Sequence, residues 1–306
     1  MIISAVKYTK EIGSKIKERY YYAAIMDAIG QSNPAYQFVP GTLTINVQTL
    51  KAGSAIDRNA DTYDANTTRT WTNEVTPYKL RKYKEYSDVV DAWYGEDTDG
   101  LATAVNVLNE FEATSKPVEY TCYYSQEFYT QVTALDTENS THNLHEATIT
   151  SATDAWNKFD ECANAIDNSA IVGSKIAFVS NTYYNKLRAG DRNQRIVMNG
   201  EKVVNNFISV IDDFVIFRIP DKYMKSKYTF PAASTGSIAA APDAVQMHMI
   251  MLVDSAVITP SKLDDVFISN PENTKGKTII TEAYAYDLFV NKRYADGVQI
   301  LADTKG

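Results

Sequence analysis

Residues 42–48 read TLTINVQ and residues 68–76 read TRTWTNEVT. The first run alternates polar and apolar residues, which is the period of a half-buried strand, and the second is rich in threonine, which also suits a strand. A polar segment, 51–67, separates them. A two-stranded ribbon with almost no core of its own is marginal in water unless something covers its apolar face. The sequence therefore predicts that a neighbouring copy of the same protein provides that cover.

The composition is that of a globular chain, with 306 residues of which 44% are hydrophobic. Tyrosine is abundant: there are 21 Tyr against 11 Phe and 3 Trp. Because tyrosine joins an apolar ring to a polar tip, it suits surfaces that become buried on association, although ordinary core edges use it as well. The net charge of −8 argues against a general nucleic-acid-binding protein, which needs a basic surface.

The sequence also indicates the cellular compartment of the protein. Cys122 and Cys162 lie far apart in helix-like stretches, so we expect no disulfide and a reducing cytoplasm. The N-terminus has lysines but no continuous apolar run after them, so we expect no secretory signal. The longest apolar runs are much shorter than a membrane span, and we expect no membrane association.

Motifs of catalysis are missing from the sequence. It contains no phosphate-binding glycine loop, no nucleophile elbow and no zinc-protease helix motif. His142 and His145 are three residues apart in a polar run without an obvious third ligand, so we interpret them as surface residues and not as a metal site. His248 lies in an apolar strand and is interpreted as a structural residue. We interpret both cysteines as packing residues, since no basic pattern near them would lower a thiol pKa.

Around the ribbon, two segments carry charge. Residues 1–22 have a partial apolar stripe among lysines, which fits either an arm that docks on a neighbour or an amphipathic helix on its own domain. Residues 78–86 interleave four basic residues with three tyrosines. Such a pattern can bind single-stranded nucleic acid, but the segment is short and the chain is acidic, so we expect it to meet an acidic neighbour.

Beyond the ribbon, helical and strand periods alternate without regular repetition. Apolar spacing predicts an amphipathic helix over 98–113, a break at Pro117, and a second helical stretch through 120–132. Residues 136–147 are polar and predict a loop. Because strands and helices mix without βαβ repetition, the predicted class is α+β.

The later half of the chain gives clearer signals. We expect a capped helix over 151–167 and a helix capped by Ser180 or Asn181, and we expect Asp212 and Asp213 to form a turn between two strands. Asp264 and Asp265 follow a Pro-Ser pair that suggests a short helix start. Strands are expected at 175–179, 207–211, 214–219 and 245–253, with a terminal hairpin of 277–290 and 297–301.

The order of these elements is similar to that of a known family. The helix over 151–167 followed by SKIAFVSN (174–181), then DFVIFRIP (213–220) and TEAYAYDLFV (281–290), resembles the major capsid proteins of tailed bacteriophages with the Hong Kong 97-type fold, across nearly the whole chain. The resemblance implies an N-terminal arm, an extended β-hairpin loop, a peripheral domain with a spine helix and an axial domain. Their implied bounds are 1–38, 39–90, 91–147 with 254–306, and 148–253 respectively, and the spine helix corresponds to 98–113 and continues past Pro117.

What the family implies is a structural protein, not an enzyme. It implies a homo-oligomeric shell of hexamers and pentamers, made in the host cytoplasm and present in the virion as the capsid, that encloses double-stranded DNA without sequence-specific binding. Scaffolding, portal and decoration proteins are the implied partners, and no cofactor, metal or crosslink is expected. An encapsulin-like compartment or another phage structural protein, a tail tube or adaptor, is the alternative.

The predicted mechanism is association through the ribbon. We expect the ribbon to lie over an adjacent subunit, with apolar side chains supplying affinity and basic ones setting the register against acidic residues near the start of the spine helix. The predicted interface residues are Leu43, Ile45, Val47, Arg69, Trp71, Val75, Lys79, Arg81, Lys84, Glu96, Asp97 and Asp99.

Overall fold

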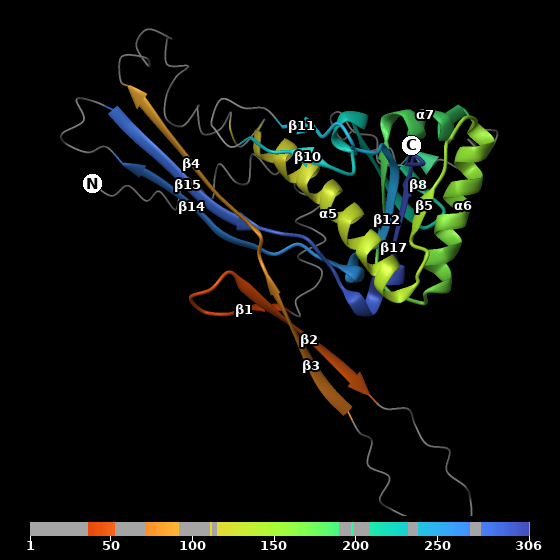
Figure 1. Cartoon of the computed structure of the whole chain (residues 1–306), viewed down its shortest axis with the longest axis horizontal. Coiled ribbons are helices and arrows are strands. Elements are labelled where there is room, and N and C mark those ends of the chain that lie inside the picture. Colours follow the sequence, from red (N-terminus) through yellow and green to blue (C-terminus); the bar gives the residue numbers. More distant parts are fainter. Residues whose placement is uncertain are drawn as a thin grey trace, which may run out of the picture.

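The structure of the chain is a computed structural model, and its described residues are 36–52, 71–91, 111, 115–189, 197–198, 209–231, 238–269 and 277–305. They form a body, in which helices lie on both faces of a sheet, and a long arm of strands that extends from this body (Figure 1). None of the helices in this part of the chain has the length and the hydropathy that crossing a lipid bilayer requires.

The body is built on a mixed sheet. Within the described residues it has seven strands in the order β5-β17-β12-β6-β9-β8-β7. In that order the strands are Leu144–Glu146, Val298–Ala302, Met247–Val253, Lys175–Ser180, Phe214–Ile219, Ser209–Ile211 and Val197–Met198. β5 runs parallel to β17 and β6 parallel to β9, while the remaining pairs are antiparallel.

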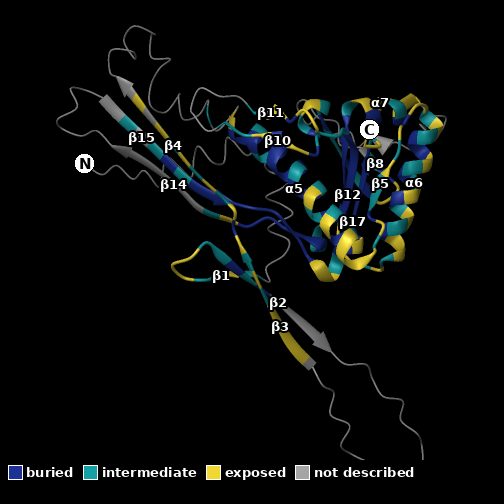
Figure 2. Ribbon diagram, in the orientation of Figure 1, coloured by how far each residue is buried: buried dark blue, intermediate teal, exposed yellow. Residues whose placement is uncertain are grey.

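Helices cover both faces of this sheet. The long helix α5 (Lys116–Asn139) packs on one face, and α6 (Ala152–Asn168) and α7 (Asn181–Ala189) pack on the other. Strand alternation divides β12 accordingly: Ile250 and Leu252 join the cluster of α5, whereas Met249 and Met251 join that of α6. Every residue of β12 and β17 is buried, as the dark blue strands of Figure 2 show.

Local sequence explains the helix ends. Ser151 caps α6 with a reciprocal capping box, because its side chain accepts from Asp154 N and Asp154 accepts from the Ser151 backbone. Pro117 lies in the first turn of α5, where its missing N–H costs nothing. At the other end of α5, Ser140 takes the left-handed conformation, φ 54°, that ends many helices.

The arm consists of two further sheets. The ribbon proper is β1-β2-β3, with β1 Tyr36–Phe38, β2 Thr44–Ala52 and β3 Trp71–Lys79, all antiparallel. The second sheet is β14-β15-β4, with β14 Ser261–Ser269, β15 Lys277–Tyr286 and β4 Lys82–Asp91. Figure 1 shows β4 continuing the line of β3 toward the opposite end of the arm.

Short elements complete the chain between these units. Three are short 3-10 helices and the rest pair as two-stranded ladders, β10 with β11 and β13 with β16. Their bounds are η3 Asp221–Tyr223, η4 Asp254–Ala256, η5 Lys292–Gly297, β10 Tyr228–Thr229, β11 Ala239–Ala240, β13 Val257–Ile258 and β16 Phe289–Val290.

Many predicted elements are confirmed. The helix over 151–167, the strand at 175–179 and the helix that follows it correspond to α6, β6 and α7. Asp212 lies in the turn between β8 and β9 with φ 52°, a conformation that short polar side chains tolerate. The strands of the ribbon are also confirmed, and β3 extends three residues past the predicted end, to Lys79. The predicted helix over 98–113 and the segment 1–22 lie outside the described residues, apart from Phe111.

Other predictions are wrong, each because a distant partner decides the outcome. No terminal hairpin forms, since β15 pairs with β4 and β14 while β17 pairs with β12 and β5. Asp264 and Asp265 lie in strand β14 and start no helix. Helix α5 begins at Lys116 with Pro117 in its first turn and reaches Asn139, so the predicted loop over 136–147 is wrong in holding four helical residues and strand β5.

The ribbon also has a core that the sequence did not reveal. Ile45 and Val47 are 0% and 3% exposed, and they pack with Leu80 against three residues from the far end of the chain. Those residues are Ile258, Ala285 and Phe289. The ribbon is therefore anchored at its root by its own chain, and we call this cluster the root core.

Candidate assembly interface

One face of α5 joins the body to the arm. Its residues recur at spacings of three and four, so they lie along one side of the helix. We call this stripe the polar seam, and its members are Lys116, Glu119, Tyr123, Glu127 and Gln131. Each contacts β15, β4 or the turns that adjoin them through a polar side-chain interaction.

The first half of the seam contacts β15. Lys116 Nζ lies 2.5 Å from Glu282 Oε1, and both side chains are almost fully buried. Tyr286 Oη donates a hydrogen bond to Glu119 Oε1 at a distance of 2.5 Å, and Lys84 Nζ of β4 lies 3.4 Å from the same oxygen. Burial, followed by the charge of Glu119, raises the pKa of the Tyr286 phenol, so this phenol stays a donor throughout the neutral range.

The second half of the seam meets the point where the ribbon joins β4. Asp287 is fully buried, and its carboxylate accepts from Tyr123 Oη at 2.8 Å and from the Arg81 guanidinium at 2.8 and 3.0 Å. Backbone N–H groups of Arg81 and Leu288 also donate to it, both at 2.8 Å. Glu127 adds a second carboxylate 2.7 Å from Arg81 Nη2.

The charges at this junction are mutually stabilised. Burial acts to lower the pKa of Arg81, but the hydrogen bonds and charge of Asp287 outweigh it and raise that pKa. Burial and the neighbouring carboxylates raise the pKa of Tyr123, which therefore remains a hydrogen-bond donor. Lys82 shows the opposite effect: burial, then the charge of Lys84, lowers its pKa, and its ammonium lies 4.3 Å from the centre of the Phe230 ring.

The outer surface of the arm is exposed. Alternation along β4 turns Lys82, Lys84 and Tyr86 toward α5 and turns Tyr83 and Val89 away from it. Tyr83 is 53% and Val89 52% exposed, and both belong to strand β4. On the ribbon, Val75 is 47% exposed. Exposed apolar groups on consecutive strands of the arm are typical of surfaces that associate with a partner.

The predicted interface residues divide into four groups. Val75 and Lys79 are exposed on β3, and Leu43 is half-buried beside the root core. Ile45 and Val47 are buried in the root core, so the expectation that a neighbouring subunit covers them is wrong for the described fold. Arg81 and Lys84 pair with Asp287 and Glu119 of the same chain and remain partly exposed, so their contact with a neighbour stays a prediction. Arg69, Glu96, Asp97 and Asp99 lie outside the described residues, as does the side chain of Trp71.

Sequence reasoning missed the polar seam and Asp287. One signal was available: Lys116, Glu119, Glu127 and Gln131 recur on one side of a helix that otherwise buries aromatic residues. Polar residues in a buried stripe require partners, so the stripe predicts a polar surface opposite. That the partners come from residues 282–287 was not visible, because they follow more than 150 residues later.

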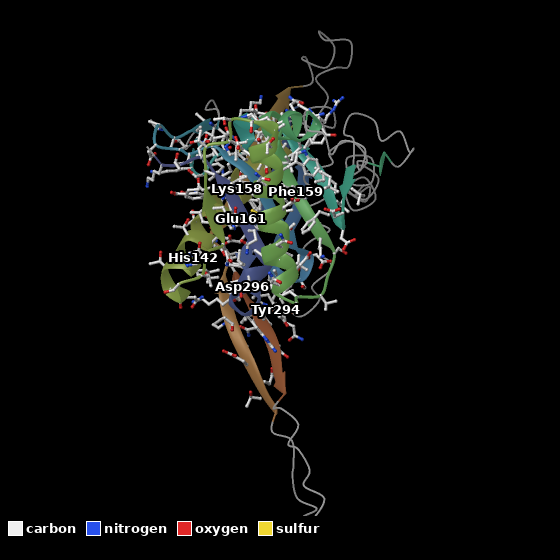
Figure 3. All side chains as sticks on the ribbon, turned by 90° about the vertical axis from the view of Figure 1, so that its right-hand side faces the viewer. His142, Lys158, Phe159, Glu161, Tyr294 and Asp296 are labelled. Atoms are coloured by element: carbon white, nitrogen blue, oxygen red, sulfur yellow. The ribbon has the colours of Figure 1, made fainter. Side chains whose placement is uncertain are left out.

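The residues considered for chemistry have structural contacts. The rings of His145 and His248 contact Gln299 and Asp303, each at 2.8 Å. Burial raises the pKa of both Cys122 and Cys162 to about 12, and both thiols are buried, which confirms that they pack. Figure 3 looks onto the face of α6, where Lys158 and Glu161 point outward and His142 lies beyond them on the chain before β5. Within the described ranges, no three His, Cys, Asp or Glu side chains gather as a metal site would require.

Comparison with known proteins places the fold. No family model and no curated protein sequence matches the chain. Among solved structures it is similar to the capsid of Ralstonia phage GP4, with TM-score 0.53 and 8% identity over 87% of this chain and 84% of that one. It is also similar to the mature capsid of bacteriophage PhiM1, with TM-score 0.52 and 11% identity over 85% of this chain and 82% of that one. The capsid of cyanophage P-SCSP1u gives TM-score 0.51 and 10% identity over 88% of this chain and 86% of that one. The predicted resemblance and the predicted α+β fold class are confirmed.

Proposed function

We propose that this chain, which has the Hong Kong 97-type capsid fold, is the major capsid protein of a tailed bacteriophage and assembles into an icosahedral shell. The observation that carries the proposal is the extent of the likeness to three phage capsids. The likeness covers at least 85% of this chain and at least 82% of each of theirs, so it is a likeness of most of the chain and not of one domain. The exposed apolar side chains of the arm agree with a subunit that is completed by its neighbours.

The proposed contact lies between the ribbon of one subunit and the outer face of the arm sheet of another. Val75, together with Trp71 and Leu43, supplies the apolar side chains of the ribbon in this contact. Tyr83 and Val89 supply the apolar surface of the subunit that receives the ribbon. Burying a side chain of this size stabilises the contact by about 1.5–3 kcal/mol, whereas an exposed ion pair contributes about 0–1 kcal/mol. Apolar contact is therefore the main source of affinity in this proposal.

Charge then sets the register. Lys79 is exposed on the ribbon, and Arg69 precedes it by ten residues in the sequence. Glu96, Asp97 and Asp99 are the acidic residues that we propose as their counterparts on the adjacent subunit. Complementary charge chooses partner and register more than it adds affinity.

The remaining partners follow from the proposed shell. Scaffolding, portal and decoration proteins, and packaged double-stranded DNA held without sequence readout, are the partners of such a subunit. The net charge of −8 supports weak contact with DNA, since strong phosphate binding would oppose packaging and release. The division into an N-terminal arm (1–38), an extended loop (39–90), a peripheral domain (91–147 with 254–306) and an axial domain (148–253) stays a proposal.

Electron microscopy of the expressed chain tests the proposal. The full chain is expressed alone and together with the products of the neighbouring genes, and the particles are examined by negative staining. We expect closed shells or capsomer-sized rings. Tubes or a stable monomer under both conditions would refute the shell, and particles that hold enzymes in place of DNA would indicate a cargo compartment.

A further inference from the structure

We propose that Arg81 and Asp287 form a lock that sets the direction of the ribbon relative to the body, so that Arg81 is a positioning residue for assembly. The inference rests on the proposed shell function, because direction matters only when the ribbon must reach a neighbour. It concerns how one subunit presents its ribbon, and it is argued from contacts within one chain.

The ribbon and the arm sheet are joined on this side by two residues. Strand β3 ends at Lys79 and β4 begins at Lys82, so only Leu80 and Arg81 lie between the two sheets. Leu80 is buried in the root core, and its N–H donates to Leu43 O at 2.7 Å. Arg81 donates its own N–H to Asp287 Oδ2 at 2.8 Å. Both residues of the joint are therefore held by other parts of the chain.

Asp287 is itself fixed to the body. Its N–H donates to Pro260 O at 3.2 Å, and its carboxylate accepts from Tyr123 on α5. About two turns further along α5, Gln131 donates to Leu288 O at 2.6 Å and accepts from Val290 N at 2.8 Å. The lock thus connects the ribbon joint to the longest helix of the described structure through a carboxylate with no exposed surface.

The Arg81 guanidinium contributes more to the orientation of the ribbon than to the stability of the fold. The Arg81 side chain is 45% exposed, so its ion pairs are partly screened by water. Its two-pronged contact with Asp287, its contact with Glu127 at 2.7 Å and its position 5.5 Å over the Phe289 ring nevertheless define one orientation. A planar fork held at three places restrains rotation of the backbone that carries it.

The length of the ribbon amplifies any change at this joint. Strand β3 has nine residues, which places its far end about 30 Å from Leu80, and a tilt of about 10° there moves that end by about 5 Å. A displacement of that size exceeds the tolerance of a packed interface. Loosening the lock should therefore change what assembles while leaving the subunit folded.

The first test compares amide hydrogen exchange in subunits of the wild type, Arg81→Gln and Arg188→Gln. Arg188 is exposed on α7, so its replacement removes the same charge at a distance from the lock. Arg81→Gln should speed exchange of peptides spanning 76–84 about tenfold, as expected for losing a hydrogen bond to a charged group. The melting temperature should shift by no more than about 2 °C, and Arg188→Gln should leave both unchanged.

The second test is the product of assembly, measured as the distribution of particle diameters. Arg81→Gln should give open or heterogeneous particles, Arg81→Lys should do the same because it keeps charge without the fork, and Arg188→Gln should match the wild type. Unchanged exchange, or faster exchange with normal particles, would overturn the lock as a positioning device. If exchange rises but the wild type forms no shells at all, the shell function fails and the local lock remains.

Discussion

The body sheet and the arm sheet are both built of strands with alternating side chains, but they differ in how far their two faces are buried. Strands β12 and β17 are buried on both faces, between α5 on one side and α6 with α7 on the other. The sheet of β4, β14 and β15 has one face on the polar seam, while Tyr83 and Val89 on the other face are half exposed. Within the described residues, the central strands of the body sheet are covered on both faces, whereas the arm sheet is covered on the face that meets the polar seam.

A second difference concerns what holds each region. The body clusters are apolar and large, so each buried side chain adds to one cooperative core. The arm is held by the small root core and by the polar seam, whose contacts depend on direction. We therefore expect substitutions in the body to affect folding and substitutions in the arm to affect assembly, and five predictions test this contrast.

The largest effect should come from the middle of the body. Phe178→Ala removes a side chain that is 1% exposed in β6, between β12 and β9. The loss of buried area and the cavity left behind should lower the free energy of unfolding by about 3–5 kcal/mol. Urea unfolding followed by circular dichroism measures it. A loss below about 1 kcal/mol would mean that the body core is less tightly packed than described.

The next effect should be local to the ribbon root. Ile45→Ala removes a fully buried side chain from the root core and should cost about 2–4 kcal/mol for opening that core. Because the cluster lies outside the body, hydrogen exchange should rise in peptides of β2 and β3 while α6 and β12 keep their protection. Equal loss of protection in the body would show that root and body unfold as one unit.

These two cores differ in how far the sequence predicts them. The signals for α6 were local: Ser151 and Asp154 form the capping box that their spacing indicates, and Trp156, Phe159 and Cys162 follow at helical intervals. The same holds for β6 and for the turn at Asp212, where short-range chemistry determines the backbone.

The root core and the lock depend on pairs that the sequence alone cannot identify. Ile45 was correctly expected to need an apolar cover, but the cover is Phe289 of the same chain and not a neighbour. Arg81 and Asp287 are 206 residues apart, and nothing in either local pattern points to the other. The strand 277–286 was assigned a wrong partner for the same reason, since hydrophobic pattern identifies a strand but not its neighbour in the sheet.

Substitutions on the exposed side of the arm should affect assembly and not folding. Val75→Asp should leave the free energy of unfolding within about 0.5 kcal/mol, because the side chain is 47% exposed, but it should greatly reduce shell yield. Val172→Asp is the matched control, an equal change at an 89% exposed valine of the body. Particle yield by sedimentation measures both. Equal yields for the two variants would place the apolar contact somewhere other than β3.

The smallest effect should come from the cap of α6, far from the arm. Ser151→Ala should cost about 1 kcal/mol at neutral pH, the usual cost of losing an N-cap, while Ser151→Thr should keep most of the cap.

The partner of this cap adds a dependence on pH. Hydrogen bonds from Thr150, then Ser151, lower the pKa of Asp154 to about 2, below its ordinary value near 3.8. A carboxylate with a lowered pKa contributes stability that is complete above the unfolded-state value and is lost as the pH falls from about 4 toward 2. Asp154→Asn should therefore flatten the pH dependence of urea unfolding in that range without changing particle yield at neutral pH. A variant that keeps the full acid dependence would assign it to other carboxylates, and one that loses particles would contradict the separation of body from arm.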